Sequence, residues 1–177
     1  MKLKSTAVIT LVFTLGMTFG AVAARRSVDS SLYRSKSKQE AATALLEAAR
    51  MQAGKDGTWE LIGVGRVYYL AGMKNEGQAL FDQVTSKKPE SSDWFRIGRV
   101  YREAGDWDKA KTAFEKALAM EKGDEKWLSE IGGYYNLEGD REKAEELFDR
   151  SYKIEKGDPW TTINMAASYM GVEPQRW

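Results

Sequence analysis

The most informative stretch of the sequence is Trp94-Phe95-Arg96-Ile97-Gly98-Arg99-Val100-Tyr101. Positions 94, 97, 98 and 101 are spaced as i, i+3, i+4 and i+7, so a helix would carry these four residues on one face. A glycine inside a helix costs about 1 kcal/mol relative to alanine. Gly98 at the centre of this face therefore indicates that a second helix approaches it closely.

A second helical pattern follows the first. Its apolar face is formed by Ala110, Ala113, Phe114, Ala117 and Leu118. Gly105-Asp106 separates the two patterns. Glycine favours the left-handed conformation just past a helix, and aspartate accepts hydrogen bonds at the start of the next one. The stretch therefore predicts a helical hairpin in which Asp106 is a cap.

The hairpin pattern occurs three times. The central glycines of the copies are 33 and then 34 residues apart, at Gly65, Gly98 and Gly132. Tyrosine stands three residues after each glycine, at Tyr68, Tyr101 and Tyr135, and phenylalanine follows at Phe81, Phe114 and Phe148. A fourth copy begins at Pro159 and stops after one helix. A fixed period of this length is typical of a solenoid.

These residues resemble the tetratricopeptide repeat (TPR), whose pattern is Trp-x-x-Leu-Gly-x-x-Tyr, a later Ala-x-x-x-Phe and a closing proline. Pro89 matches the closing proline in the first copy, whereas Lys122 and Lys156 replace it in the next two. The resemblance covers residues 58–171. It implies an all-α fold: a TPR-type helical-hairpin solenoid that forms a right-handed superhelix of about three full repeats, with a concave groove.

The pattern divides the chain into segments. We expect repeats at 58–90, 91–124 and 125–158, then a terminal helix and tail at 159–177. Residues 39–54 predict a capping helix, because the end of a solenoid has no neighbour to cover its core. Residues 24–38 predict a basic, serine-rich flexible leader.

The N-terminal segment has the order of an export signal. Lys2 and Lys4 precede an uncharged run from Ser5 to Ala24, which ends in Ala21-Val22-Ala23. This order predicts a signal peptide at 1–23 and a periplasmic or secreted protein. The alternative is an uncleaved inner-membrane anchor, since a run of about 20 apolar residues can span a bilayer.

The composition excludes several kinds of function. The 177 residues contain no cysteine and no histidine, which removes disulfides, thiol chemistry and imidazole bases or metal ligands. The formal net charge of +1 argues against nucleic-acid binding. We expect no cofactor, no metal and no catalysis, although carboxylate-only chemistry is formally open.

The resemblance also implies where a partner would bind. In the family, the inner face of each first helix lines the groove. That face corresponds here to Trp59, Ile62, Arg66, Tyr69, Phe95, Arg99, Arg102, Ser129 and Asn136. Arginines beside aromatic residues suit a carboxylate or an acidic, partly apolar peptide. The alternative for each residue is ordinary core packing or a solvated surface charge.

The incomplete fourth copy predicts a second surface. Its apolar residues Trp160, Ile163 and Met170, with Trp177 beyond them, would form an interface, including one for a homodimer, unless the tail covers them. The sequence therefore favours a protein-protein interaction module in the bacterial cell envelope: an adaptor, an assembly factor or a chaperone-like holder that binds a protein or peptide. The alternative is a self-associating structural subunit of an envelope complex.

Overall fold

The structure is a computed structural model that describes residues 28–121 and 123–175. In these ranges every regular element is helical. A short 3-10 helix, η1 (Ser30–Leu32), precedes eight α-helices. These are α1 (Lys38–Ala53), α2 (Thr58–Leu70), α3 (Lys74–Thr85), α4 (Ser91–Glu103), α5 (Trp107–Met120), α6 (Glu125–Leu137), α7 (Arg141–Ile154) and α8 (Pro159–Tyr169). The predicted all-α fold is confirmed. The predicted signal peptide, Lys122 and Trp177 lie outside the described residues.

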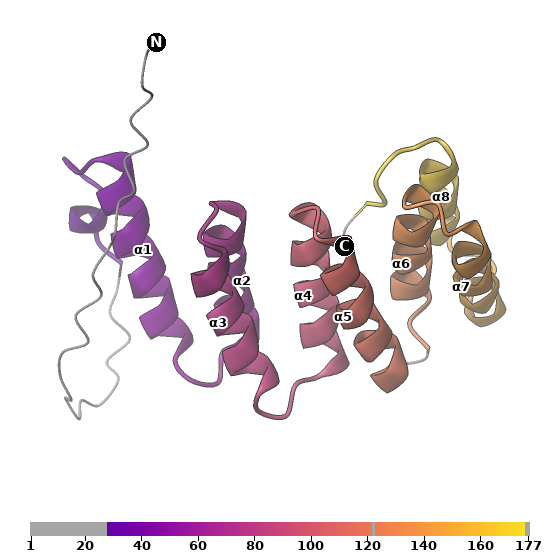
Figure 1. Cartoon of the computed structure of the whole chain (residues 1–177), viewed down its shortest axis with the longest axis horizontal. Coiled ribbons are helices and arrows are strands. Elements are labelled where there is room, and N and C mark those ends of the chain that lie inside the picture. The colour runs from indigo at the N-terminus through magenta and orange to yellow at the C-terminus, as the bar shows by residue number, and fades with distance from the viewer. Residues whose placement is uncertain (1–27, 122, 176–177) are drawn as a thin grey trace, which may run out of the picture.

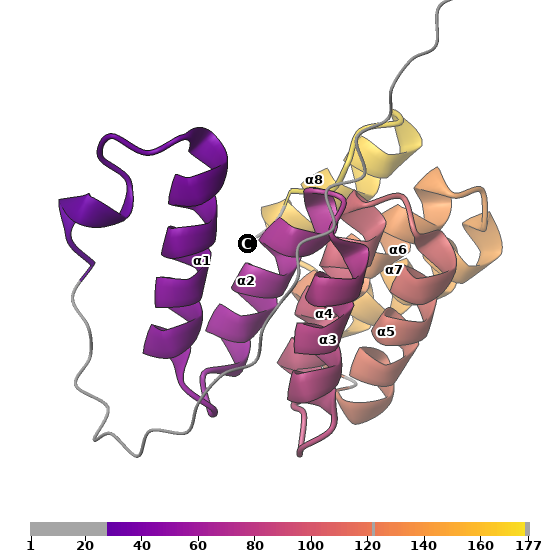
Figure 2. The same cartoon turned by 60° about the vertical axis from the view of Figure 1, so that its left-hand side comes forward.

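The helices form a row of antiparallel hairpins. Figure 1 shows α2–α3, α4–α5 and α6–α7 side by side, with α1 at one end and α8 at the other. Figure 2 shows the same order from another side, with α1 at the edge of the row beside α2. Among the described residues, no helix combines the length and the apolar character needed to cross a bilayer.

The repeated glycines are the points where the two helices of a hairpin meet. At each one, a Cβ atom would lie only 2.6 Å from a phenylalanine ring atom of the second helix. The pairs are Gly65 with Phe81, Gly98 with Phe114, and Gly132 with Phe148. Because real Cβ atoms do not approach so closely, only glycine fits without moving the ring. The close contact predicted from the sequence is confirmed.

The turn inside the second hairpin differs from the prediction in one respect. Gly105 has the expected left-handed backbone, with φ of 75°. The Asp106 side chain, however, makes no capping hydrogen bond to α5. Its carboxylate instead accepts hydrogen bonds from Tyr69 Oη at 2.6 Å and from Lys74 Nζ at 2.8 Å. The hydrogen bond from Lys74 makes the largest contribution to lowering the pKa of the Asp106 carboxyl group, and the hydrogen bond from Tyr69 makes the next largest. Asp106 therefore joins the first repeat to the second.

The N-terminal end of the array is covered by α1, which packs against α2. A capping box starts α1: Glu40 N donates to Ser37 Oγ at 3.3 Å, and Ser37 N donates to Glu40 Oε2 at 2.9 Å. Before this cap, Asp29 accepts a hydrogen bond from Ser31 N and starts η1. The sequence prediction of a flexible leader over 24–38 did not include this turn.

Candidate functional site

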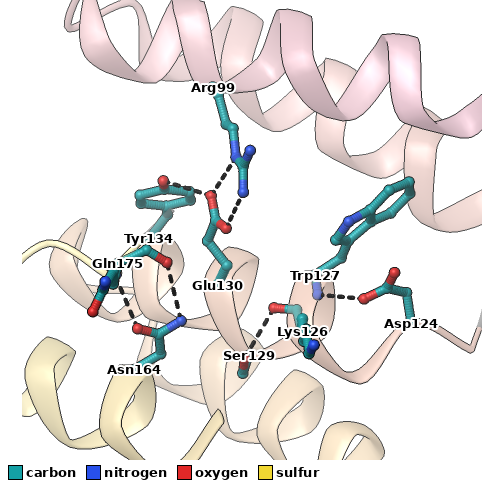
Figure 3. A network of polar contacts seen from close by, with 9 residues as sticks. All are labelled: Arg99, Asp124, Lys126, Trp127, Ser129, Glu130, Tyr134, Asn164 and Gln175. Carbon is teal, nitrogen blue, oxygen red and sulfur yellow. Dashed lines mark hydrogen bonds and ion pairs between the residues drawn. The ribbon is translucent and has the colours of Figure 1, made fainter. Parts of the chain in front are cut away.

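The first helices of the hairpins, α2, α4 and α6, together with α8, form a surface that we call the first-helix face. Arg66 of α2 and Arg99 and Arg102 of α4 lie on it. At its centre is a buried ion pair between α4 and α6 (Figure 3). Arg99 Nε donates to Glu130 Oε1 at 2.6 Å, and Arg99 Nη2 donates to Glu130 Oε2. Tyr134 Oη donates to the same carboxylate at 2.8 Å. The Glu130 side chain is only 1% exposed. Arg99 therefore joins two repeats and is not the free ligand-binding arginine that the sequence predicted.

The other two predicted arginines are also paired. Arg66 Nε donates to Glu103 Oε2 at 2.8 Å, which links α2 to α4 at the surface. Arg102 Nη2 lies 3.3 Å from Glu138 Oε1 and 2.8 Å from Glu173 Oε1. All three arginines of the predicted groove are therefore ion-paired within the chain. Arg102 does bind an acidic segment, but that segment belongs to the same chain.

Four predicted groove residues belong to the core instead. They are Ile62, Tyr69, Phe95 and Ser129, which are 4%, 1%, 2% and 0% exposed. The reason is that the first helices of successive repeats pack on one another. The Tyr69 ring meets the Tyr101 ring edge-on with centroids 5.4 Å apart, and the Phe95 ring stacks on Trp127 at 4.5 Å. A bound partner cannot reach these side chains, so their predicted role is wrong.

Trp59 and Asn136 remain accessible. Trp59 is exposed, and the Arg96 guanidinium lies 3.6 Å from its ring centroid. Asn136 is half-buried, and its Nδ2 donates to Ser168 Oγ of α8 at 3.0 Å. These two residues lie on α2 and α6, so the structure does not bring them together into one site.

The most specific feature of this face is the segment after α8, which the sequence suggested only as a possible cover for the apolar residues of the terminal helix. Figure 1 shows this segment turning back from α8 across α6. Glu173 reaches Arg102 of α4, Pro174 is buried, and the backbone of Gln175 is hydrogen-bonded to Asn164 of α8 (Figure 3). A signal for it was present in the sequence. Gly133 directly follows the packing glycine Gly132, and hairpin packing does not explain it.

The C-terminal end of the array presents apolar side chains. Trp160, Ile163 and Met170 are 46%, 48% and 81% exposed. The Tyr169 ring packs in a tilted orientation against the Phe148 ring, with centroids 6.1 Å apart. Nothing in residues 28–121 and 123–175 groups three or more side chains that could hold a metal ion.

Comparisons with known proteins agree with this architecture. Residues 92–124 match the family model described as the tetratricopeptide repeat. The fold is similar to a solved structure described as the crystal structure of MamA, with a TM-score of 0.52 and 18% sequence identity. That similarity covers 66% of this chain and 70% of the other. Among curated protein sequences the chain has no match. Residues 92–124 therefore match a tetratricopeptide repeat, and the chain has the all-α helical-hairpin fold of a repeat solenoid.

Proposed function

We propose that this protein is a non-catalytic protein-protein interaction module that binds an extended segment of a partner on its first-helix face. One observation carries the proposal: that face already holds an extended segment, residues 172–175 of the same chain, through backbone hydrogen bonds, an ion pair and a buried proline. A solenoid surface commonly serves binding. The role is that of an adaptor, an assembly factor or a chaperone-like holder, and it needs no cofactor.

Capture of the partner from an extract of the native host tests this function. Arg102→Glu places a carboxylate beside Glu138 and Glu173, which repels an acidic segment. We expect this variant to lose the partners that the wild-type protein retains. Lys153→Glu makes the same change of charge at an exposed position of α7 and should retain them. Equal capture by the wild-type and Arg102→Glu proteins would contradict a site on the first-helix face.

The place of action follows from the N-terminal sequence. We propose that the segment is a signal peptide removed after Ala23 or Ala24, and that the mature protein acts in the bacterial envelope. Mass spectrometry of protein from the native host should then find an N-terminus at Ala24 or Arg25. An intact Met1 in an envelope-localised protein would instead favour a retained membrane anchor.

A second candidate function is self-association through the exposed end of α8. Its support is the exposure of Trp160, Ile163 and Met170 at the last helix of the array. Apolar patches of this kind commonly mark interfaces. Light scattering after size-exclusion chromatography should show a dimer that Trp160→Ser with Met170→Ser converts to a monomer. A monomeric wild-type protein at high micromolar concentration would exclude this candidate.

A further inference from the structure

The C-terminal tail is held by contacts that do not depend on its belonging to this chain. Gln175 N donates to Asn164 Oδ1 at 2.9 Å, and Asn164 Nδ2 donates to Gln175 O at 3.3 Å. One carboxamide thus satisfies both backbone groups of one residue. The Asn164 side chain is buried and is fixed on α8. It recognises an extended backbone, and it would hold any residue at this place.

A slot beside Asn164 fits a proline ring. Pro174 is buried, and a Cβ atom on Gly133 would lie 2.5 Å from Pro174 Cγ. The absence of a side chain at position 133 therefore makes room for the ring. Proline also holds its own φ and biases the preceding residue to an extended backbone, so such a segment loses little entropy on docking.

The repeat itself explains why this site exists. Moving 34 residues along the chain, the step between Gly98 and Gly132, takes Arg99 to Gly133 and Glu130 to Asn164. The buried ion pair of the second and third repeats therefore has no counterpart at the third and fourth. A glycine and a neutral amide replace it, and Pro174 with Gln175 fills the space.

Arg102 selects the residue before the proline. Its Nη2 lies 2.8 Å from Glu173 Oε1, and the Glu173 side chain is 56% exposed. Solvent screens a pair this open, so it holds the tail weakly. Arg102 Nε is buried and has no hydrogen-bond acceptor among the described residues.

The chain also contains the turn that brings the tail to this site. Gly171 has φ of 74°, a left-handed backbone that favours glycine, and Val172 N donates to Ala167 O at 2.9 Å. The helix thus ends in a reversal that sends residues 173–175 back over α6.

We propose that the tail is an intramolecular ligand of the partner-binding site, and that this site selects extended peptides in which an acidic residue directly precedes a proline. This inference rests on the function proposed above and specifies its ligand and its regulation. A tethered segment competes at an effective concentration of about millimolar. The partner must therefore displace residues 172–175, and the closed tail keeps the site from binding weakly matched segments.

The test uses the full chain and a synthetic peptide of residues 170–177, labelled with fluorescein and followed by fluorescence anisotropy. Glu173→Lys with Pro174→Ser opens the tail and leaves the site intact. We expect this variant to bind the peptide at least about tenfold more tightly than the wild-type protein, since a closed site reduces apparent affinity by the fraction that is open. A peptide with the same two changes should bind neither protein.

A matched pair of glycine variants locates the peptide in the tail-opened protein. Gly133→Ala fills the slot and should abolish binding. Gly63→Ala should preserve binding, because a Cβ atom there meets nothing within 4 Å. Circular dichroism confirms that each variant is folded. Equal binding to wild-type and tail-opened proteins, no binding to either, or binding unaffected by Gly133→Ala would each overturn the inference. If capture of the native partner still depends on Arg102, the proposed function survives that failure.

Discussion

Replacement of Arg99 by methionine is expected to lower the free energy of unfolding by about 3–5 kcal/mol, the usual cost of leaving a buried charge without its partner. Arg99 donates two hydrogen bonds to the Glu130 carboxylate, and the Glu130 side chain is only 1% exposed. Among the residues that the structure describes, Tyr134 Oη would then be the remaining hydrogen-bond donor to that carboxylate. Urea unfolding at neutral pH, followed by circular dichroism, measures the effect.

Two further variants separate this cause from simple loss of a side chain. Arg66→Met breaks a similar pair, but the Arg66 and Glu103 side chains are 44% and 26% exposed. We expect a loss of about 0–1 kcal/mol there. Adding Glu130→Gln to Arg99→Met removes the buried charge and should restore much of the stability. Similar losses for Arg99→Met and Arg66→Met would contradict the structural role of Arg99.

Replacement of Gly98 by leucine should destabilise the second hairpin by roughly 3 kcal/mol, the upper part of the usual range for overpacking a core. A Cβ atom at this position would lie 2.6 Å from both Cδ1 and Cε1 of Phe114. Phe114 is fully buried, so its ring has no free space to move into. Thermal unfolding by circular dichroism should show a clear fall in the melting temperature.

Gly63→Leu is the matched control, since Gly63 is also inside a first helix but has open space around it. Leucine is a better helix former than glycine, so this variant should be stable to within about 1 kcal/mol of the wild-type protein. If Gly98→Leu unfolds at the same temperature as Gly63→Leu, the glycines do not mark close contacts between helices.

The hairpins could be predicted because their signals are local. Spacings of three and four residues define each apolar face, and a glycine followed 16 residues later by a phenylalanine marks each contact between paired helices. The repeat then places the same contact at Gly65, Gly98 and Gly132. These features do not depend on how one repeat is rotated relative to the next.

The site was harder to predict because it does depend on that rotation. The family resemblance places Tyr69 and Phe95 on the inner side of their helices, but only the packing between repeats decides that both are covered. The Arg99–Glu130 pair spans 31 residues, and neither charge shows in the sequence that it is buried. The tail has no periodic pattern at all. Gly133 makes room for Pro174, but only the structure shows what the missing side chain is for.

Photocrosslinking in the native host shows whether a partner protein contacts the first-helix face. A photoreactive phenylalanine derivative would replace Glu138, at the end of α6 beside Arg102, or Asp149, on the exposed side of α7. We predict that the residue at position 138 forms a covalent adduct with the partner, and that the adduct disappears when Arg102→Glu is added. We predict no adduct at position 149. An adduct at position 149 without one at position 138 would contradict the account.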